Sequence, residues 1–358
     1  MARAQQLAIM RHGGPEVFKQ IEIAIPDLGP GAIMIRTHFA GINFADIMAR
    51  VGLYPDAPKP PMVVGYEVSG VIEAVGMGVT GFNPGDKVLA LTLFGGYSSR
   101  VVVPQERVRL VPEGVSLEAA AALPVVYLTA HLMLYKLGSL MMGDIVLIHG
   151  AGGGVGTAAL QLAKLKGARV FATASRGKHE RVRSMGAELV VDPAQDDFVA
   201  MVLDATEGRG VDLVLDPQGP ANFARSFKTL ASLGKLVMFG IQSSVARRRK
   251  LSDLFRLLWS NLGINFSPIQ LMNTNRGVHG FNLGHLWDRP EPVMTALDEL
   301  VTWLGEGKIS PEVDRVLAYR RVPEAHAYIQ SRQNFGKVLL DFRVLTGTAD
   351  QAPTVSGQ

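Results

Sequence analysis

The chain has 358 residues, of which 47% are hydrophobic and 19% charged, and this excludes disorder of the whole chain and favours about two domains. Its net charge of +4 gives no electrostatic reason to expect nucleic-acid binding. The absence of cysteine excludes disulfides, thiolate zinc sites, iron–sulfur clusters and cysteine nucleophiles. No apolar run is long enough to span a bilayer and the N-terminus has no signal-peptide core, so a cytoplasmic protein is expected.

The first 112 residues are predicted to form short strands separated by turns rich in Gly and Pro. The segments rich in Val and Ile are Ala32–His38, Val63–Val75, Lys87–Leu91 and Ser99–Val103. This pattern indicates an antiparallel sheet or a partly open barrel. Ser116–Leu137 follows as an Ala- and Leu-rich helical stretch that Pro124 should interrupt.

A regular alternation of apolar strands and helices follows. The predicted strands are Ile145–His149, Arg169–Thr173, Glu188–Val191, Val211–Leu215 and Lys235–Phe239. The predicted helices are Val155–Lys166, Lys178–Met185, Phe198–Thr206 and Asn222–Leu233. Continuous apolar strands are typical of a parallel sheet covered on both faces, which predicts a doubly wound α/β domain.

After this alternation the pattern predicts a strand at Gly277–Leu283, a helix at Pro292–Leu304 and a strand at Gly336–Phe342. The expected domains are a β-rich substrate domain over 1–123 and 285–343 and a nucleotide-binding domain over 124–284. The polar tail 344–358 is expected to be disordered.

A glycine-rich loop joins the first α/β strand to the helix after it, in the order His149-Gly150-Ala151-Gly152-Gly153-Gly154-Val155-Gly156. Such a loop lets backbone N–H groups approach a pyrophosphate at the positive end of the helix. Its position between strand and helix favours dinucleotide binding over the alternative, a flexible turn at a helix start. The candidate cofactor-binding residues here are Gly152, Gly153, Gly154, Val155 and Gly156.

The end of the second strand predicts which nucleotide binds. An acidic residue there would bind the ribose 2′-hydroxyl of NAD, but this chain has Ser175, Arg176 and Lys178 instead. These side chains could hold a 2′-phosphate through charge-assisted hydrogen bonds, which favours NADPH. Solvated charges at a helix start are the alternative interpretation.

The β-rich N-terminal part followed by A-x-G-G-V-G resembles the medium-chain dehydrogenase/reductase superfamily. Pro84-Gly85-Asp86-Lys87-Val88 and Gly41-Ile42-Asn43-Phe44-Ala45-Asp46 carry the same likeness. In the zinc alcohol dehydrogenases of that superfamily, metal ligands stand at the positions of Asn43 and Tyr66 and near Val125. Because this chain has no thiolate and no helical histidine pair, we expect no metal site and no zinc-assisted alcohol oxidation.

The remaining features resemble the zinc-free quinone oxidoreductase branch, which includes zeta-crystallin, and within it the vesicle amine transport protein homologues. Residues 43–50, Gly52-Leu53-Tyr54 and the long segment 247–284 carry this likeness. It implies a GroES-like domain, a Rossmann NADP(H) domain, a cofactor cleft between them and a homodimer. It also implies that Asn43, Tyr54 and Thr129 line the nicotinamide pocket. The other residues implied to border the cofactor are Gly240, Ile241, Gln242, Phe281, Asn282, Asn334 and Lys337.

We therefore expect an NADPH-dependent oxidoreductase that transfers hydride to a quinone or an α,β-unsaturated carbonyl. Tyr54 is the candidate proton donor, with loop packing as its alternative role. Asn43 is the candidate ligand of the substrate oxygen, with backbone capping as its alternative role. A structural ion pair between Glu67 and an arginine is favoured over a role of Glu67 as general acid.

Two other functions stay open from the residues alone. One is an enoyl-thioester reductase, and the other is a nucleotide-binding protein with weak or no catalysis that acts at a membrane, at a vesicle or on a partner. The run Arg247-Arg248-Arg249-Lys250 could make peripheral contact with anionic lipid, although a solvated helix or a pocket lid is favoured.

Overall fold

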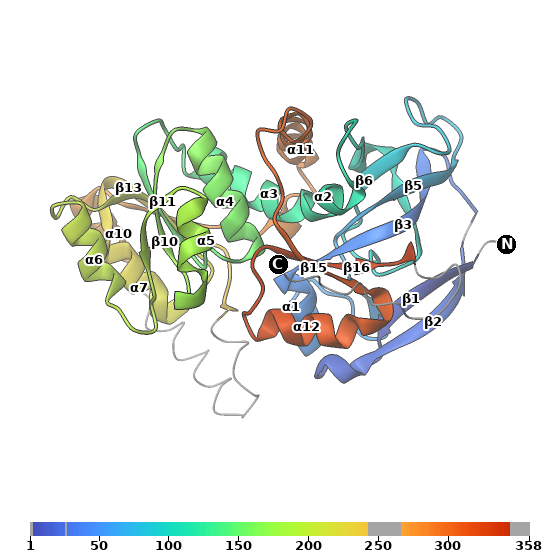
Figure 1. Ribbon diagram of the computed structural model, residues 1–358, viewed down its shortest axis with the longest axis horizontal. Helices are drawn as coiled ribbons and strands as arrows, with labels where there is room; N and C mark the ends of the chain where they lie inside the picture. The colour runs from blue at the N-terminus through green and yellow to red at the C-terminus, as the bar shows by residue number, and fades with distance from the viewer. Residues whose placement is uncertain (1–2, 26, 243–265, 344–358) are drawn as a thin grey trace, which may run out of the picture.

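The computed structural model describes residues 3–25, 27–242 and 266–343, which form two halves side by side (Figure 1). The basic run Arg247–Lys250 and the tail 344–358, for which the sequence made predictions, lie outside these described residues. No helix in the described ranges combines the length and the apolar character needed to cross a membrane.

The N-terminal half is built mainly on antiparallel strands, as the short apolar segments predict. In its seven-stranded sheet, six strands lie in the order β15, β16, β3, β5, β6, β8, and β7 pairs with β3. These strands are β3 (Ala32–Ile42), β5 (Glu67–Val75), β6 (Lys87–Leu91), β7 (Arg100–Pro104), β8 (Val108–Leu110), β15 (Val313–Ala318) and β16 (Lys337–Asp341). A second sheet contains β1 (Arg3–Ile9), β2 (Phe18–Ala24) and β4 (Met62–Val63). The helices of this half are α1 (Phe44–Val51), α2 (Leu117–Ala122) and α12 (Val322–Gln330).

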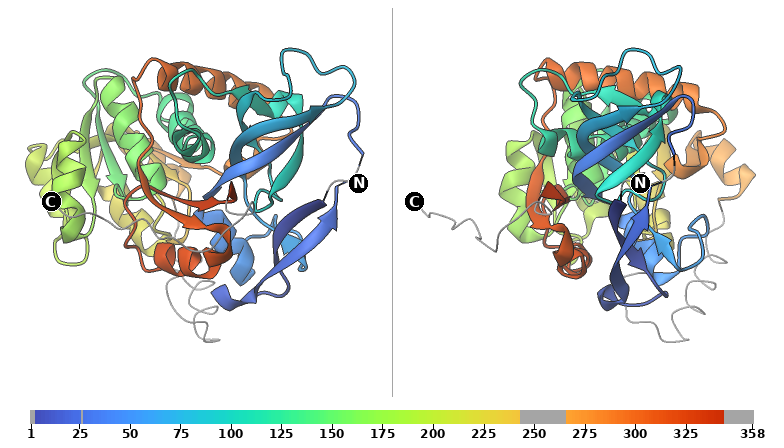
Figure 2. Two further views of the ribbon diagram at one scale, coloured as in Figure 1. Left: turned by 45° about the vertical axis from the view of Figure 1, so that its right-hand side comes forward. Right: turned by 90° about the vertical axis from the view of Figure 1, so that its right-hand side faces the viewer.

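The C-terminal segment returns to the first half, where the red β16 lies beside the blue β3 (Figure 2). β16 runs antiparallel to β3, with Val338 opposite Ile42. This register places Lys337 next to Asn43, although the two residues are far apart in the sequence. Helix α11 (Pro290–Gly305) packs instead on α3 (Pro124–His131), within the core that covers one face of the parallel sheet in the second half. The residue limits of the two domains stay a prediction.

The second half is the predicted doubly wound domain. Its six strands are all parallel, in the order β11, β10, β9, β12, β13, β14. They are β9 (Ile145–His149), β10 (Arg169–Thr173), β11 (Ala187–Val191), β12 (Val211–Asp216), β13 (Leu230–Met238) and β14 (Gly277–Gly280). The helices are α3, α4 (Gly154–Leu165), α5 (His179–Ser184), α6 (Phe198–Ala205), α7 (Pro220–Lys228) and α10 (Pro268–Thr274). β9 alternates its side chains between two cores, Val146 and Ile148 on one face and Ile145 and Leu147 on the other.

The structure differs from one helix prediction and agrees with another. The predicted helix Asn222–Leu233 is wrong at its end, because α7 stops at Lys228 and β13 begins at Leu230, which pairs with Val211. Pairing with β12 outweighs the helical propensity of these residues. The predicted interruption at Pro124 is confirmed, because Pro124 opens α3 as a new helix.

Candidate active site

A cavity of about 310 Å³ opens where the parallel strands end. His149, Thr173, Asp192, Pro217 and Phe239, which end or follow β9 to β13, all line it. The chain order reverses direction across the sheet at β9, which separates β10 and β11 from β12 and β13. Ligands of open α/β sheets bind at such a point, at the carboxyl ends of the strands. The cavity therefore lies where a dinucleotide would bind.

The glycine loop forms the floor of this cavity. Gly150 has a φ of +69°, and the Gly153 N–H donates to the Gly150 carbonyl at 2.9 Å. A Cβ at Gly156 would contact Gly150 O and lie 2.6 Å from Ala151 Cα, so glycine lets α4 pack directly on the loop. A Cβ at Gly153 would meet only Gly150 O, at 3.4 Å, which leaves space above the start of α4. This open floor and the unpaired N–H groups of a helix start fit a pyrophosphate.

The predicted polar residues Ser175, Arg176 and Lys178 follow β10, at the end of the cavity where the adenosine of a dinucleotide would lie. We call this end the adenosine side. The three residues have different surroundings. Ser175 lines the cavity and Arg176 does not, and both are exposed after the end of β10. Lys178 also lines the cavity, but its Nζ donates to the carbonyls of Arg332 at 2.8 Å and Asn334 at 2.6 Å. Burial lowers the pKa of Lys178. Two of the three N–H donors of Lys178 thus hold the C-terminal segment, and binding of a 2′-phosphate by Ser175, Arg176 and Lys178 stays a prediction.

The other residues implied by family likeness are divided between the cavity and its surroundings. Gln242 and Asn334 line it, whereas Gly240 packs on Pro217 just beside it. Thr129 is buried on α3 and, like Ile241, does not line the cavity. Phe281 packs against the core shared with α3, also away from the lining.

Two charged residues that line the cavity, Asp192 and Arg332, were not predicted. Asp192 is buried at the end of β11 and accepts a hydrogen bond from Arg176 N at 3.0 Å. Asp192 directly follows the predicted apolar strand Glu188–Val191, and this position could have identified it as a cavity residue. Arg332 also lines the cavity, and its Nη2 donates to Gln242 O at 3.3 Å. No local pattern in the sequence marks Arg332.

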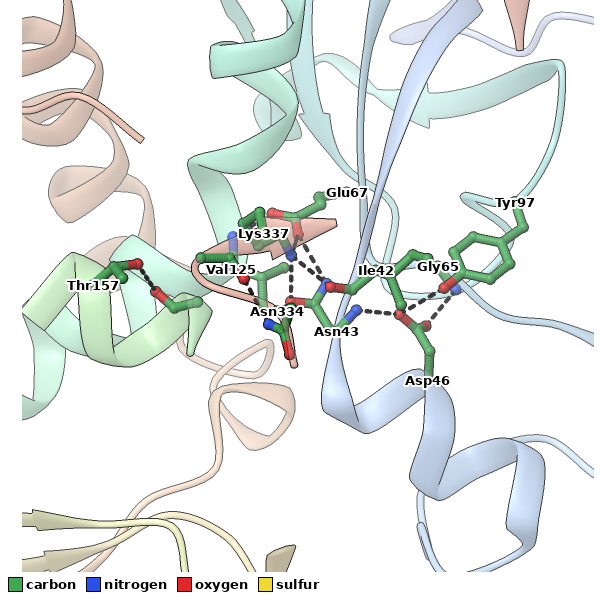
Figure 3. Close-up of polar contacts among 12 residues, drawn as sticks. Ile42, Asn43, Asp46, Gly65, Glu67, Tyr97, Val125, Thr157, Asn334 and Lys337 are labelled. Atoms are coloured by element: carbon green, nitrogen blue, oxygen red, sulfur yellow. Dashed lines mark hydrogen bonds and ion pairs between the residues drawn. The ribbon is translucent and has the colours of Figure 1, made fainter. Parts of the chain in front are cut away.

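A buried polar cluster lies where the first domain meets the cavity (Figure 3). Lys337 Nζ donates to Ile42 O at 2.9 Å, to Asn43 Oδ1 at 2.8 Å and to Glu67 Oε1 at 2.5 Å. Asn43 Nδ2 also donates to Glu67 Oε1, at 2.8 Å, and Val125 N donates to Glu67 Oε2, at 2.7 Å. The side chains of Glu67 and Lys337 are 0% and 3% exposed, so Glu67 does form a structural ion pair, but with a lysine instead of the predicted arginine.

The amide orientation of Asn43 follows from these partners. Because Lys337 can only donate, Oδ1 must face the ammonium, and Nδ2 must face the Glu67 carboxylate. One N–H of Nδ2 then remains for another acceptor, and Asn43 lines the cavity together with Lys337. Asn43 is also the N-cap of α1, which agrees with the predicted capping role, while its role in binding the substrate oxygen stays a prediction.

The Asp46 carboxylate holds the start of α1 through hydrogen bonds. Its Oδ2 accepts from Asn43 N at 2.7 Å and from the Tyr97 hydroxyl at 3.2 Å, and its Oδ1 accepts from Gly65 N at 2.8 Å. Burial raises the pKa of Asp46 to about 7, and its backbone hydrogen bonds and the Lys337 ammonium act in the opposite direction.

We expect Asp46 to make the protein less stable as pH rises from about 4 to about 7. Its pKa is higher in the folded chain than in the unfolded chain, so the folded state binds more protons in this range and the free energy of unfolding falls with pH. The Asp46 shift of about three pKa units corresponds to a loss of about 4 kcal/mol in the free energy of unfolding across this range. Urea unfolding of wild type and Asp46→Asn across this range checks the prediction. Equal slopes in both proteins would contradict it.

Tyr54 lies on the loop after α1 and faces the second domain. Its hydroxyl donates to Asn282 Oδ1 at 3.3 Å, and His285 Nε2 lies 2.8 Å from Asp56 Oδ2 in the same pair of loops. Burial and Asp56 raise the pKa of Tyr54, so its hydroxyl keeps its proton at neutral pH. The structure thus brings the predicted Tyr54 and Asn282 together, with neither among the residues that line the cavity.

The donor set at the alcohol-dehydrogenase metal positions does not suit zinc. Asn43 and Tyr66 replace the thiolate and imidazole, Val125 offers no side-chain ligand, and the Lys337 ammonium occupies the space beside Glu67. Burial raises the pKa of Tyr66, which keeps the phenol protonated. Nowhere in the described ranges do three or more His, Cys, Asp or Glu side chains gather in a group that could hold a metal ion.

The fold defines a two-domain protein of the alcohol dehydrogenase type. Residues 29–113 match the family described as alcohol dehydrogenase GroES-like domain, and residues 185–340 match the family described as zinc-binding dehydrogenase. The chain belongs to the medium-chain dehydrogenase/reductase superfamily, and it is an oxidoreductase homologue with the GroES-like and Rossmann-type domains of that superfamily.

Two curated relatives cover most of the chain. The synaptic vesicle membrane protein VAT-1 homolog of Homo sapiens is 38% identical over 319 residues, which is 88% of this chain and 80% of that protein. The quinone oxidoreductase of Pseudomonas aeruginosa is 32% identical over 339 residues, which is 94% of this chain and 99% of that protein.

Three solved structures show the same fold. The human VAT-1 homolog-like protein has a TM-score of 0.83 at 30% identity and covers 98% of this chain and 100% of its own. Mycobacterial Rv1454c, complexed with NADPH, has a TM-score of 0.81 at 28% identity, with coverage of 94% and 99%. The CurK enoyl reductase has a TM-score of 0.82 at 27% identity, with the same coverage.

Proposed function

We propose that this protein is an NADPH-dependent, zinc-independent oxidoreductase that reduces quinones or α,β-unsaturated carbonyls. The observation that carries the proposal is the buried Asn43–Glu67–Lys337 cluster beside the cavity at the carboxyl ends of the parallel strands. A fixed amide and an ammonium stand there in place of metal ligands. The quinone oxidoreductase relative and the NADPH complex of Rv1454c support the reaction class and the cofactor.

One set of residues would bind the phosphates of the cofactor, and another would bind the substrate oxygen. The glycine loop and the start of α4 would hold the pyrophosphate, and Ser175 and Arg176 would hold the 2′-phosphate. When bound, the reduced nicotinamide supplies a hydride. The free N–H of Asn43 would donate to the substrate oxygen as negative charge develops on it. Because Lys337 polarises the amide and Glu67 fixes its direction, this donor is preorganised.

The deciding experiment is NADPH oxidation by the purified protein with a panel of quinones, enones and enoyl thioesters. Turnover of quinones or enones that survives a zinc chelator is the expected result. Turnover of enoyl thioesters alone would replace the proposal with an acyl-thioester reductase, which the likeness to the CurK enoyl reductase favours as second candidate. NADPH binding without turnover of any acceptor would favour a non-catalytic nucleotide-binding role.

We expect Arg176→Ala to raise the KM for NADPH about ten- to a hundredfold and to leave the KM for NADH almost unchanged. A charge-assisted hydrogen bond to a phosphate contributes about 1.5–3 kcal/mol, and only NADPH carries the 2′-phosphate. Arg183→Ala, at an exposed arginine in the last turn of α5, is the matched control. Equal losses with both cofactors would assign Arg176 a different role.

Tyr54→Phe is expected to lower kcat for an enone at least tenfold if this phenol delivers the proton. The substrate oxygen would take the place that Asn282 Oδ1 has in front of the Tyr54 hydroxyl. Steady-state rates and an NADPH titration of the variant check this, with the NADPH Kd expected to be unchanged. An undiminished kcat would leave water as the proton source.

A further inference from the structure

Four buried polar side chains form a chain of hydrogen bonds beneath the glycine loop, from strands β9, β10 and β12 and helix α7. His149, Thr173, Asp216 and Ser226 are each at most 2% exposed. His149 Nδ1 lies 3.0 Å from Thr173 Oγ1, and His149 Nε2 lies 3.0 Å from Ser226 Oγ. Ser226 donates to Asp216 Oδ2 at 2.6 Å. Burying these groups costs free energy unless each is paired, and here each is paired with the next.

The direction of each hydrogen bond follows from the acceptor at one end. The Asp216 carboxylate accepts from Ser226, from Asn222 Nδ2 at 2.8 Å and from Gln218 N at 2.7 Å. Since the only Ser226 proton points to Asp216, Ser226 Oγ must accept from His149 Nε2–H.

The rest of the chain follows from that tautomer of His149. Nδ1 is then unprotonated and accepts from the Thr173 hydroxyl, and Thr173 Oγ1 accepts from Gly150 N at 3.3 Å. Burial lowers the pKa of His149, which agrees with a ring that carries one proton. Every donor therefore points from the glycine loop toward Asp216.

The two ends of this chain reach separate walls of the cavity. Gly150 belongs to the glycine loop, and Thr173 immediately precedes Ala174 and Ser175 at the adenosine side. Gln218, whose N–H donates to Asp216, lines the wall that follows β12. One connected set of hydrogen bonds thus sets the relative position of three strand ends.

We propose that Asp216, Ser226, His149 and Thr173 are positioning residues that hold the glycine loop in its dinucleotide-binding shape. The inference rests on the proposed nucleotide site. It states that four side chains, three on strands and one on α7, raise the affinity for the cofactor by positioning the loop. Directional hydrogen bonds restrict the loop more narrowly than apolar packing of the same volume would.

Thr173→Val tests the proposal, because valine keeps the volume and removes the hydroxyl. NADPH binding is measured by fluorescence titration without an acceptor, and ¹⁵N spectra of the histidine rings report the tautomer of His149. We expect the Kd for NADPH to rise about three- to tenfold in Thr173→Val and to recover in Thr173→Ser, with kcat at saturating NADPH unchanged. Wild type should show His149 protonated at Nε2, and Ser226→Ala should change this signal.

Ser69→Ala is the matched control, because Ser69 is a fully buried hydroxyl that donates to Leu117 O in the other half of the molecule. It should lower stability without changing the NADPH Kd. A wild-type Kd in Thr173→Val, or His149 protonated at Nδ1, would overturn the positioning role alone. A wild-type protein that does not bind NADPH would overturn the proposed function together with it.

Discussion

Replacing Lys337 by methionine is expected to lower the free energy of unfolding by about 3–5 kcal/mol, because the Glu67 carboxylate would remain buried without its cation. Methionine keeps much of the side-chain volume, so the loss reports the charge and its three hydrogen bonds. The same change should lower kcat/KM, since Asn43 Oδ1 loses the donor that orients the amide. Urea unfolding at neutral pH and steady-state kinetics measure the two effects.

Two further variants separate the charge from simple damage to the fold. Adding Glu67→Gln to Lys337→Met should recover part of the lost stability, because it removes the uncompensated carboxylate. Lys308→Met breaks the exposed pair with Glu306 and should cost at most about 1 kcal/mol. If Lys337→Met costs no more than Lys308→Met, the buried ion pair does not stabilise this end of the cavity.

The half that contains the parallel sheet was largely predictable because its signals are local. The apolar run Ile145–His149, the glycines after it and the amphipathic start of α4 lie within about 20 consecutive residues, and each indicates the same strand–loop–helix unit. The exception is the end of α7, where pairing of β13 with β12 determines the structure.

The substrate end could not be predicted in the same way, because its contacts join distant parts of the chain. The sequence indicates that Glu67 needs a cation, but the partner lies 270 positions away and reaches it only because β16 pairs with β3. Lys178 was predicted to bind a phosphate, and local pattern could not show that its ammonium also donates to the carbonyls of Arg332 and Asn334. The Tyr54–Asn282 contact likewise depends on how the two halves meet.

Gly156→Ala should destabilise the protein by about 1–3 kcal/mol and weaken NADPH binding more than tenfold. In an ordinary helix, alanine in place of glycine stabilises by about 1 kcal/mol, so the expected sign is reversed here. The reason is that the new Cβ would contact the backbone at Gly150 O and Ala151 Cα, which no side-chain rotation can relieve. Helix α4 must then move away from the loop, and the pyrophosphate site widens.

Two other glycines separate packing from cofactor access. A Cβ at Gly177 would meet nothing within 4 Å, so Gly177→Ala should change neither stability nor NADPH affinity. A Cβ at Gly153 would meet only Gly150 O, so Gly153→Ala should keep the fold and still weaken binding by occupying the space meant for the pyrophosphate. Thermal unfolding and NADPH titration of the three variants give this pattern if the loop binds a dinucleotide. Close contact between α4 and the loop requires glycine at position 156 whether or not a ligand binds, so a loss of stability alone does not locate the pyrophosphate. Unchanged NADPH affinity in Gly153→Ala and Gly156→Ala would place the pyrophosphate elsewhere.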